Sequence, residues 1–272
     1  MTKIANVLAG LLILIVFSAK AQSPTGRIVL ISTNYGDMKV KLYDETPKSR
    51  DNFVKLVEKG FYDSLLFHRV IKEFMIQGGD PDSKNAAPGM MLGGGDVGYT
   101  VPAEFNDSLF HKKGALCAAR MENPEKAGSG CQFYIVHGKK YTDAELDNME
   151  LNINQNIRLP YTFQSILSDP KNAALREQYL RYQQNSQRDS INALVATTIQ
   201  PMINKKMKMF KYSPSQRATY KTLGGTPVLD QNYTVFGEVI EGMDVIDKIA
   251  TTPTGQADRP VTDVVMKMKV VK

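Results

Sequence analysis

The chain is poor in the residues that most enzymes use for chemistry. Its 272 residues include no tryptophan, two cysteines and three histidines. The histidines (His68, His111 and His137) lack the spacing of a zinc pair on a helix, and the cysteines lack that of zinc ligands. No nucleophile elbow or paired-carboxylate motif occurs, and the glycine-rich stretch LGGGDVGY lacks the Lys-Ser/Thr ending of a phosphate-binding loop. We therefore expect no metal, no cofactor and no covalent catalysis.

Long hydrophobic runs are also scarce, and the longest begins near the N-terminus. In MTKIANVLAGLLILIVFSAKAQSP, Lys3 precedes an apolar run that ends at Ala19-Lys20-Ala21. A basic start, an apolar stretch shorter than the ~20 residues of a spanning helix and a small-x-small site are typical of a secretory signal peptide. We predict that residues 1–21 are removed and that the protein is exported, periplasmic or secreted. The alternative is an uncleaved membrane anchor. Residue 22 is glutamine and not cysteine, so we expect no lipid attachment at the new N-terminus.

Charge of one sign is not in large excess. The formal net charge is +6, and without residues 1–21 the chain has 32 basic and 28 acidic residues, a net charge of +4. This excess is too small to indicate nucleic-acid binding, and after cleavage no further segment predicts a membrane contact. An apolar content of 42% and a charged content of 23% are those of a globular protein.

The two cysteines leave two possibilities open. Cys117 and Cys131 flank the turn-rich stretch MENPEKAGSG, and an exported protein can form disulfides. If that stretch joins paired strands, the two thiols could face each other. The alternative, which we prefer, is a pair of buried reduced thiols.

The pattern outside residues 139–222 predicts a mainly β protein. Residues 27–44 have two β-rich runs around a turn at residues 34–37, which indicates a hairpin. Short apolar runs separated by glycine-rich turns continue to residue 138 and resume after residue 223. Frequent short strands of this kind favour a sandwich or a barrel.

Two helices are expected within the β region. In ETPKSRDNFVKLVEKGFYD, Thr46 is placed to cap a helix, Pro47 suits its first turn and Gly60 can end it. A second, shorter helix is expected around residues 243–249.

A helical block, called the insertion here (residues 139–222), interrupts the β domain of residues 27–138 and 223–272. It opens with a capping box, Thr142 to Glu145, and its last helix begins at Ser213. Between them an apolar stripe has helical spacing, with Pro201 expected to kink it: Ile191, Leu194, Val195, Thr198, Ile199, Met202 and Ile203. The stripe must be buried against something, so the insertion could roof a site, extend it, dock a partner or merely pack on the β domain.

One arginine stands in an unusually apolar stretch, FHRVIKEFMIQGGDP at residues 67–81. A reaction that needs no nucleophile, proton transfer or metal would suit a lone guanidinium there. Rotation about an X–Pro peptide bond is such a reaction, with a barrier of ~18–20 kcal/mol from amide resonance. In the twisted amide the nitrogen lone pair is free to accept a hydrogen bond, which Arg69 could donate from an apolar pocket. A structural ion pair is the alternative reading of Arg69.

Around these residues the sequence resembles the cyclophilins, which are peptidyl-prolyl cis/trans isomerases. The resemblance rests on FHRVIKEFMIQGGDP and, in order, on GYTVPAEF, GALCAAR, GSGCQFYIV and LDQNYTVFGEVIEGMDVIDKI. It covers about residues 27–138 and 223–272. It implies a closed eight-stranded antiparallel barrel capped by two helices, here interrupted by the α-helical insertion.

The resemblance also implies roles for ten residues, matched one by one. Arg69 matches the catalytic arginine, and we assign Gln77 to the catalytic group together with it. The remaining matches concern substrate binding. Four residues match the proline pocket: Phe74, Met75, Tyr134 and Leu229. Gln77 and Gln132 match side chains that hold the substrate backbone, and Ala119 and Arg120 match the ridge that pairs with the peptide N-terminal to proline. Tyr233 stands where many members have a pocket histidine. Gly95 or Gly98 lies near the entrance glycine.

Three positions depart from the family pattern. Tyr134 replaces a common phenylalanine and keeps the ring, and Tyr233 keeps a hydrogen-bond donor that does not titrate near neutral pH. Val228 occupies the place of a tryptophan that helps to bind cyclosporin in sensitive members. The resemblance therefore implies activity nearly independent of pH from about 6 to 8 and weak inhibition by cyclosporin.

The resulting hypothesis is an exported peptidyl-prolyl cis/trans isomerase that assists the folding of exported proteins and acts on proline-containing unfolded or extended polypeptides. A binding or chaperone module on a cyclophilin-like scaffold, with the insertion engaging a partner, is the alternative.

Overall fold

The core of the protein is an eight-stranded antiparallel sheet. The computed structural model describes residues 27–271, so the predicted signal peptide lies outside the described residues. The strand order is β10-β1-β2-β9-β6-β8-β4-β3. The strands are β1 (Ile28–Thr33), β2 (Gly36–Leu42), β3 (Arg69–Ile71), β4 (Met75–Gly78), β6 (Ala115–Ala118), β8 (Phe133–Val136), β9 (Val235–Glu241) and β10 (Met266–Val270). A separate two-stranded sheet pairs β5 (Thr100–Val101) with β7 (Gly128–Ser129).

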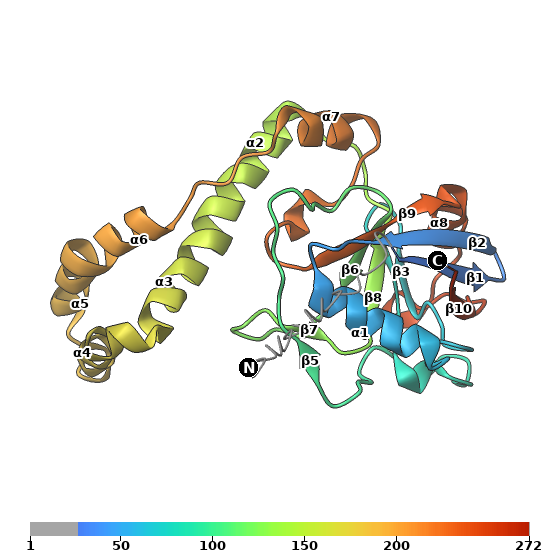
Figure 1. Ribbon diagram of the computed structural model, residues 1–272, viewed down its shortest axis with the longest axis horizontal. Helices are drawn as coiled ribbons and strands as arrows, with labels where there is room; N and C mark the ends of the chain where they lie inside the picture. The colour runs from blue at the N-terminus through green and yellow to red at the C-terminus, as the bar shows by residue number, and fades with distance from the viewer. Residues whose placement is uncertain (1–26, 272) are drawn as a thin grey trace, which may run out of the picture.

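The sheet curls around one apolar core that two helices complete. The predicted hairpin is present as β1 and β2, with Thr33 opposite Gly36 across the turn. Helix α1 (Pro47–Glu58) buries Phe53 and Val57 in this core, and α8 (Met243–Ala250) buries Ile246. Figure 1 shows α1 and α8 on different sides of the curled sheet. The two expected helices are therefore confirmed.

The expected closed barrel is wrong, because the sheet is open between β3 and β10. A single antiparallel bridge, Leu66 to Val265, spans this gap together with backbone hydrogen bonds from residues 64–67 to residues 264–266. The chain before β3 contains Ser64, whose φ of 70° lies in the left-handed region, so the backbone there is not a regular strand. The irregular segment of residues 64–67 therefore connects the two edges of the sheet without forming a regular strand pair.

The N-terminus of α1 is capped differently from the sequence prediction. Thr46 occupies the N-cap position but makes no capping hydrogen bond through its side chain. Instead, the carboxylate of Glu104 accepts hydrogen bonds from the backbone N–H groups of Lys48 (3.0 Å) and Ser49 (2.9 Å). A carboxylate at this helix end also interacts favourably with the helix dipole.

The insertion projects from the β domain as an elongated pair of helical segments (Figure 1). Its helices are α2 (Asp143–Asn152), α3 (Leu159–Ser168), α4 (Ala173–Gln184), α5 (Arg188–Leu194), α6 (Gln200–Lys206) and α7 (Pro214–Thr222). The capping boxes at Thr142 and Ser213 are both present. Within residues 27–271, no helix is long and apolar enough to cross a membrane.

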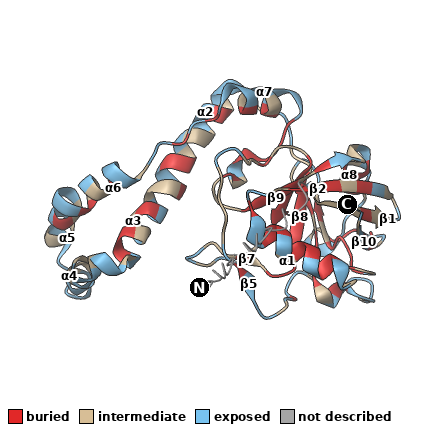
Figure 2. Ribbon diagram, in the orientation of Figure 1, coloured by how far each residue is buried: buried red, intermediate tan, exposed pale blue. Residues whose placement is uncertain are grey.

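The centre of the apolar stripe packs inside the insertion itself. Ile199 and Ile203 pack against Ile166 and Leu167 of α3, and Figure 2 shows the buried positions along α3. The expected kink at Pro201 takes the form of a π-helical turn, Val195–Ile199, directly before α6. Proline has no backbone N–H to donate within the helix, and the regular α-helical pattern is interrupted directly before it.

The two cysteines are free and buried in the structure. Cys117 packs in the cluster of Met75 and Tyr134, whereas Cys131 belongs to the central core. Because the two thiols belong to different apolar clusters, they do not meet across the loop. The structure therefore has the two reduced thiols that we preferred.

Candidate active site

The predicted site residues converge on one surface cavity of about 110 Å³. Nine of the ten line it, and Gln132 lies beside it through a hydrogen bond to Gln77. The nine are Arg69, Phe74, Met75, Gln77, Ala119, Arg120, Tyr134, Leu229 and Tyr233. They come from β3, β4, the end of β6, β8 and the segment before β9. Within the described chain, no residue of the insertion lines this cavity, so its helices do not plug it.

Arg69 is held at the cavity by the β3–β4 hairpin and one ion pair. It lies opposite Gln77 in the strand register, so the two side chains project from the same face of the sheet. Its Nε donates to Oδ2 of Asp258 at 3.3 Å. The Arg69 side chain is 40% exposed, so the guanidinium is more accessible to water than the sequence suggested. A bound proline residue would cover part of this surface.

Two glutamines form the polar edge of the cavity. Nε2 of Gln77 donates to Oε1 of Gln132 (3.0 Å), and Nε2 of Gln132 donates to the backbone oxygens of Gly93 (3.0 Å) and Gly95 (2.8 Å). Both amide groups are therefore oriented by partners on the protein. Gly93, Gly95 and Gly98 line a neighbouring pocket together with Gln132, which places both glycines named from sequence beside the site.

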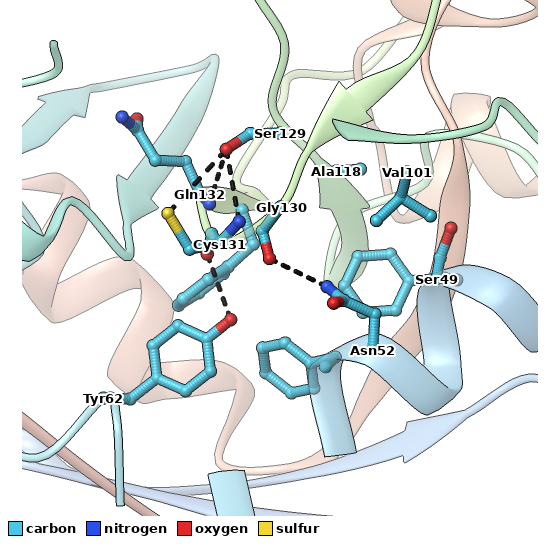
Figure 3. Close-up of a pocket in the computed structure, with 12 residues that line it drawn as sticks. Ser49, Asn52, Tyr62, Val101, Ala118, Ser129, Gly130, Cys131 and Gln132 are labelled. Carbon is cyan, nitrogen blue, oxygen red and sulfur yellow. Dashed lines mark hydrogen bonds between the residues drawn. The ribbon is translucent and has the colours of Figure 1, made fainter. Parts of the chain in front are cut away.

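Side chains from three parts of the chain hydrogen-bond to the backbone at residues 130–132 (Figure 3). Oγ of Ser129 accepts from the N–H groups of Cys131 (3.2 Å) and Gln132 (3.0 Å). Nδ2 of Asn52 on α1 donates to the oxygen of Gly130 (2.8 Å), and the Tyr62 hydroxyl donates to the oxygen of Cys131 (3.0 Å). The small apolar hollow in this view, about 20 Å³, belongs to the core beneath the site.

Arg120 and Tyr233 form the opposite wall. The guanidinium carbon of Arg120 lies 4.6 Å from the ring centroid of Tyr233, a cation–π contact. Nη2 and Nε of Arg120 donate to the side chain (3.0 Å) and backbone (3.2 Å) of Asn232. The Tyr233 ring in turn packs edge-on against Tyr134 at 5.9 Å. Both side chains of this wall are therefore held by contacts within the protein.

A buried hydrogen-bond network lies behind Tyr134. Its hydroxyl is 3.0 Å from Nε2 of His111, whose Nδ1 is 2.7 Å from Oδ1 of Asp230. Oδ2 of Asp230 accepts hydrogen bonds from the hydroxyls of Tyr212 and Tyr220, both at 2.6 Å. Burial raises the pKa of Tyr134 well above its usual value. Because Tyr212 and Tyr220 belong to the insertion, the network joins the insertion to the cavity wall.

His68 is buried directly beside Arg69 in sequence. Both ring nitrogens lack a hydrogen-bond partner among the described residues. Burial lowers the pKa of His68 to about 4, with Asp80 acting in the opposite sense. The imidazole is therefore neutral at physiological pH and adds no positive charge next to Arg69.

The geometry and the comparisons with known proteins agree. The family model for "Cyclophilin type peptidyl-prolyl cis-trans isomerase/CLD" matches residues 28–155 and 214–270. This chain belongs to the cyclophilin family of peptidyl-prolyl cis-trans isomerases. The family match passes over residues 156–213, most of the helices that project from the β domain.

Bacterial relatives of this cyclophilin extend over most of its length. A peptidyl-prolyl cis-trans isomerase of Staphylococcus epidermidis is 33% identical over 241 residues, which cover 88% of each chain. A bifunctional phosphatase/peptidyl-prolyl cis-trans isomerase of Streptococcus pyogenes is 31% identical over 250 residues. The match covers 90% of this chain but only 39% of the streptococcal protein.

A solved structure supports the fold assignment. A cyclophilin type peptidyl-prolyl cis-trans isomerase of Cryptosporidium parvum superposes with a TM-score of 0.51 at 18% identity, covering 91% of this chain and 99% of its own. The similarity concerns the arrangement of the strands and helices. It agrees with the mainly β architecture described above.

Sequence reasoning missed the residues that support the site of this cyclophilin. Asp258, which pairs with Arg69, lies 189 positions further along the chain, and no local pattern connects the two. Asn232 holds Arg120 and adjoins the pocket residue Tyr233, so its position could have drawn attention. His111 carries a visible signal as one of three histidines, but its partner Asp230 is recognisable only from the fold.

Proposed function

We propose that this cyclophilin catalyses cis/trans isomerisation of X–Pro bonds in extended or unfolded polypeptides and assists the folding of exported proteins. The observation that carries the proposal is the convergence of Arg69 and an apolar wall in one cavity. Phe74, Met75 and Leu229 supply a surface for the proline ring. Catalysis of this step is useful because uncatalysed isomerisation takes tens of seconds or longer.

The mechanism is electrostatic stabilisation of the twisted amide. Rotation removes the resonance that accounts for a barrier of ~18–20 kcal/mol, and the nitrogen lone pair becomes an acceptor. In this mechanism Arg69, which lines the cavity, donates to that nitrogen through a terminal nitrogen, since Nε is already paired with Asp258. Gln77 and Gln132 can hold the substrate backbone so that only one side of the bond rotates. An interaction made only in the twisted state lowers the barrier without trapping the substrate.

Two further observations support the substrate and the location. A structure of the Cryptosporidium parvum cyclophilin was determined in the presence of the dipeptide Ala-Pro. Its TM-score with this chain is 0.50. The signal-like pattern in residues 1–21 supports export.

Replacing Arg69 with alanine tests the catalytic role. A hydrogen bond from a charged donor is worth ~1.5–3 kcal/mol, so we expect kcat/KM for a short proline peptide to fall about 10- to 150-fold. Arg69→Lys keeps the charge but loses the planar fork, and we expect intermediate activity. Lys72→Ala, an exposed cation in the same hairpin, is the matched control. Unchanged catalysis by Arg69→Ala, with the fold intact, would reject the assignment.

The second candidate is a holding module that uses the insertion. It is favoured by α4, which buries no residue, and by the separate apolar cluster that α3 and α6 form. Nη1 of Arg158 donates to the backbone oxygen of Lys208 at 2.9 Å, so a short linker can replace residues 159–207 between them. If the shortened protein isomerises a short peptide normally but no longer retards aggregation of an unfolded client, the insertion has a holding function.

A further inference from the structure

A second cavity lies where the insertion meets the β domain. It has a volume of about 310 Å³ and is separate from the proline pocket. Phe105 and Asp107 contribute from the β domain, and Tyr161 of α3 and Lys206 of α6 contribute from the insertion. We call this cavity the junction cleft.

Two aromatic rings and a lysine make contact with one another at the junction cleft. The ring centroids of Phe105 and Tyr161 are 6.4 Å apart in an edge-on arrangement. Nζ of Lys126, from the loop before β7, lies 5.8 Å from the centroid of Phe105 and 5.5 Å from that of Tyr161. Tyr161 nevertheless remains 46% exposed, so much of an aromatic surface is available to a ligand.

Two chain segments connect the junction cleft with the substrate site. Gln231 lines the cleft, and Leu229 and Tyr233 on either side of it line the proline pocket. The loop of residues 119–127 lines the proline pocket and its glycine-rich neighbour, and its Lys126 reaches the aromatic pair. The two cavities are therefore lined by residues that lie close together along the chain.

The charge of the junction cleft is positive. Arg158 is paired with Asp107, and Lys206 donates to the neutral hydroxyl of Ser165 at 2.7 Å. Among the ion pairs found in residues 27–271, none involves Lys206, Lys208 or Lys126. Burial, reinforced by the charge of Arg120, lowers the pKa of Lys126 to about 8. A carboxylate entering here would meet cations that lack a countercharge.

We propose that the junction cleft binds an acidic, aromatic-containing stretch of the same polypeptide whose proline occupies the catalytic pocket. Carboxylates would pair with Lys206 and Lys208, and an aromatic side chain would pack on Tyr161 and Phe105. The inference rests on the proposed function, because the client is a proline-containing chain. The insertion then determines which polypeptides bind, whereas the proline pocket determines the rate of rotation about the X–Pro bond.

The test measures the binding of synthetic peptides by fluorescence anisotropy. Each contains the same Ala-Ala-Pro-Ala core, flanked on both sides by eight-residue extensions that reach ~25 Å. One set of extensions is built from Asp, Glu and Phe, a second from Ser and Asn, and a third from Lys and Phe. We expect the acidic aromatic peptide to bind about tenfold more tightly than the neutral one, with an advantage that shrinks as salt is raised.

Two pairs of variants locate the binding. The double variant Lys206→Ala/Lys208→Ala should weaken the acidic peptide about fivefold, whereas Lys205→Ala, exposed on the same helix but outside the cleft, should not. Tyr161→Ala should weaken it by a similar factor. Leu180→Ala, equally exposed at 46% on α4, should have no effect.

Turnover of the unextended core peptide separates this inference from the proposed function. All four variants should isomerise it at the wild-type rate, since none touches the pocket. Wild-type protein could fail to isomerise the core peptide but still bind the acidic peptide through the lysines. That result would reject the proposed isomerase function and keep the proposed binding role of the junction cleft. If the acidic peptide gains nothing over the neutral one, or the double variant binds it as well as Lys205→Ala does, the inference is overturned.

Discussion

Asp230 depends on the insertion for half of its hydrogen bonds. Its Oδ1 accepts from the backbone N–H (2.8 Å) and Nδ1 of His111, and its Oδ2 accepts from the hydroxyls of Tyr212 and Tyr220. The carboxylate is 1% exposed, so water cannot replace a lost donor. We predict that removing the two tyrosine hydroxyls destabilises the whole protein.

The size of this effect follows from the charge and the burial of the carboxylate. A hydrogen bond to a charged group contributes ~1.5–3 kcal/mol, and bonds that share one acceptor are not strictly additive. We expect Tyr220→Phe to lower the free energy of unfolding by about 2 kcal/mol and the double variant with Tyr212→Phe by about 4 kcal/mol. Total stability is typically ~5–15 kcal/mol, so the loss is large. With m near 3 kcal/mol/M, the urea midpoints should fall by roughly 0.7 and 1.3 M.

Urea unfolding followed by circular dichroism, with kcat/KM measured below the transition, checks this prediction. Catalysis should change less than about threefold, because the ring of Tyr134 still lines the pocket. Tyr182→Phe is the matched control, since its hydroxyl bonds only the neutral side chain of Gln178 on the exposed α4. A loss below about 1 kcal/mol in the double variant would refute the argument that the insertion supports Asp230.

The remaining predictions concern single groups. Asp258→Asn should lower kcat/KM up to about fivefold without destabilising the fold, because the ion pair that orients Arg69 is half exposed; an unchanged rate would contradict this. The pKa of His68 is depressed to about 4, so the unfolded chain takes up its proton first. Stability should be full above pH 6.5 and fall by up to about 3 kcal/mol towards pH 4, as urea titrations of wild type against His68→Gln would reveal. Activity should stay flat from about pH 6 to 8, and a steep change across that range would be inconsistent with the site. Cyclosporin should inhibit weakly, since Val228 stands at the tryptophan position; tight inhibition would count against the match. Denatured, non-reduced protein should titrate two free thiols.

The parts of the fold that the sequence predicted are those with local signals. The turn between β1 and β2, the capping box at Thr142 and the helix cap at Ser213 each occupy a few consecutive residues. The cap of α1 failed because its acceptor, Glu104, lies 55 positions from Ser49. The open edge of the sheet failed for a related reason, since the irregular backbone around Ser64 has no distinctive residue pattern.

The site shows the same division between local and distant information. Its lining residues lie in a few motifs of the chain, so nine of the ten residues that the resemblance named line the cavity. Asp258 could not be named, because its contact with Arg69 exists only after the sheet has curled. The apolar stripe around Ile199 predicted an amphipathic helix, but α3 and the β domain were equally suitable surfaces for it to pack on.

The two ends of the insertion lie side by side where it joins the β domain, so the β domain can accommodate the insertion within a loop. Its ends meet at Gly225, which bridges to both Lys139 and Lys112, and Gly138 and Gly224 beside them have φ angles of 65° and 90° that favour glycine. Ends that lie side by side let a long segment enter a loop at a small cost in closure entropy. Since the residues that line the pocket all belong to the β domain, we predict that substitutions in the distal helices leave the rate of rotation unchanged. Substitutions near Asp230 lack this freedom, because there the insertion and the cavity wall share one carboxylate.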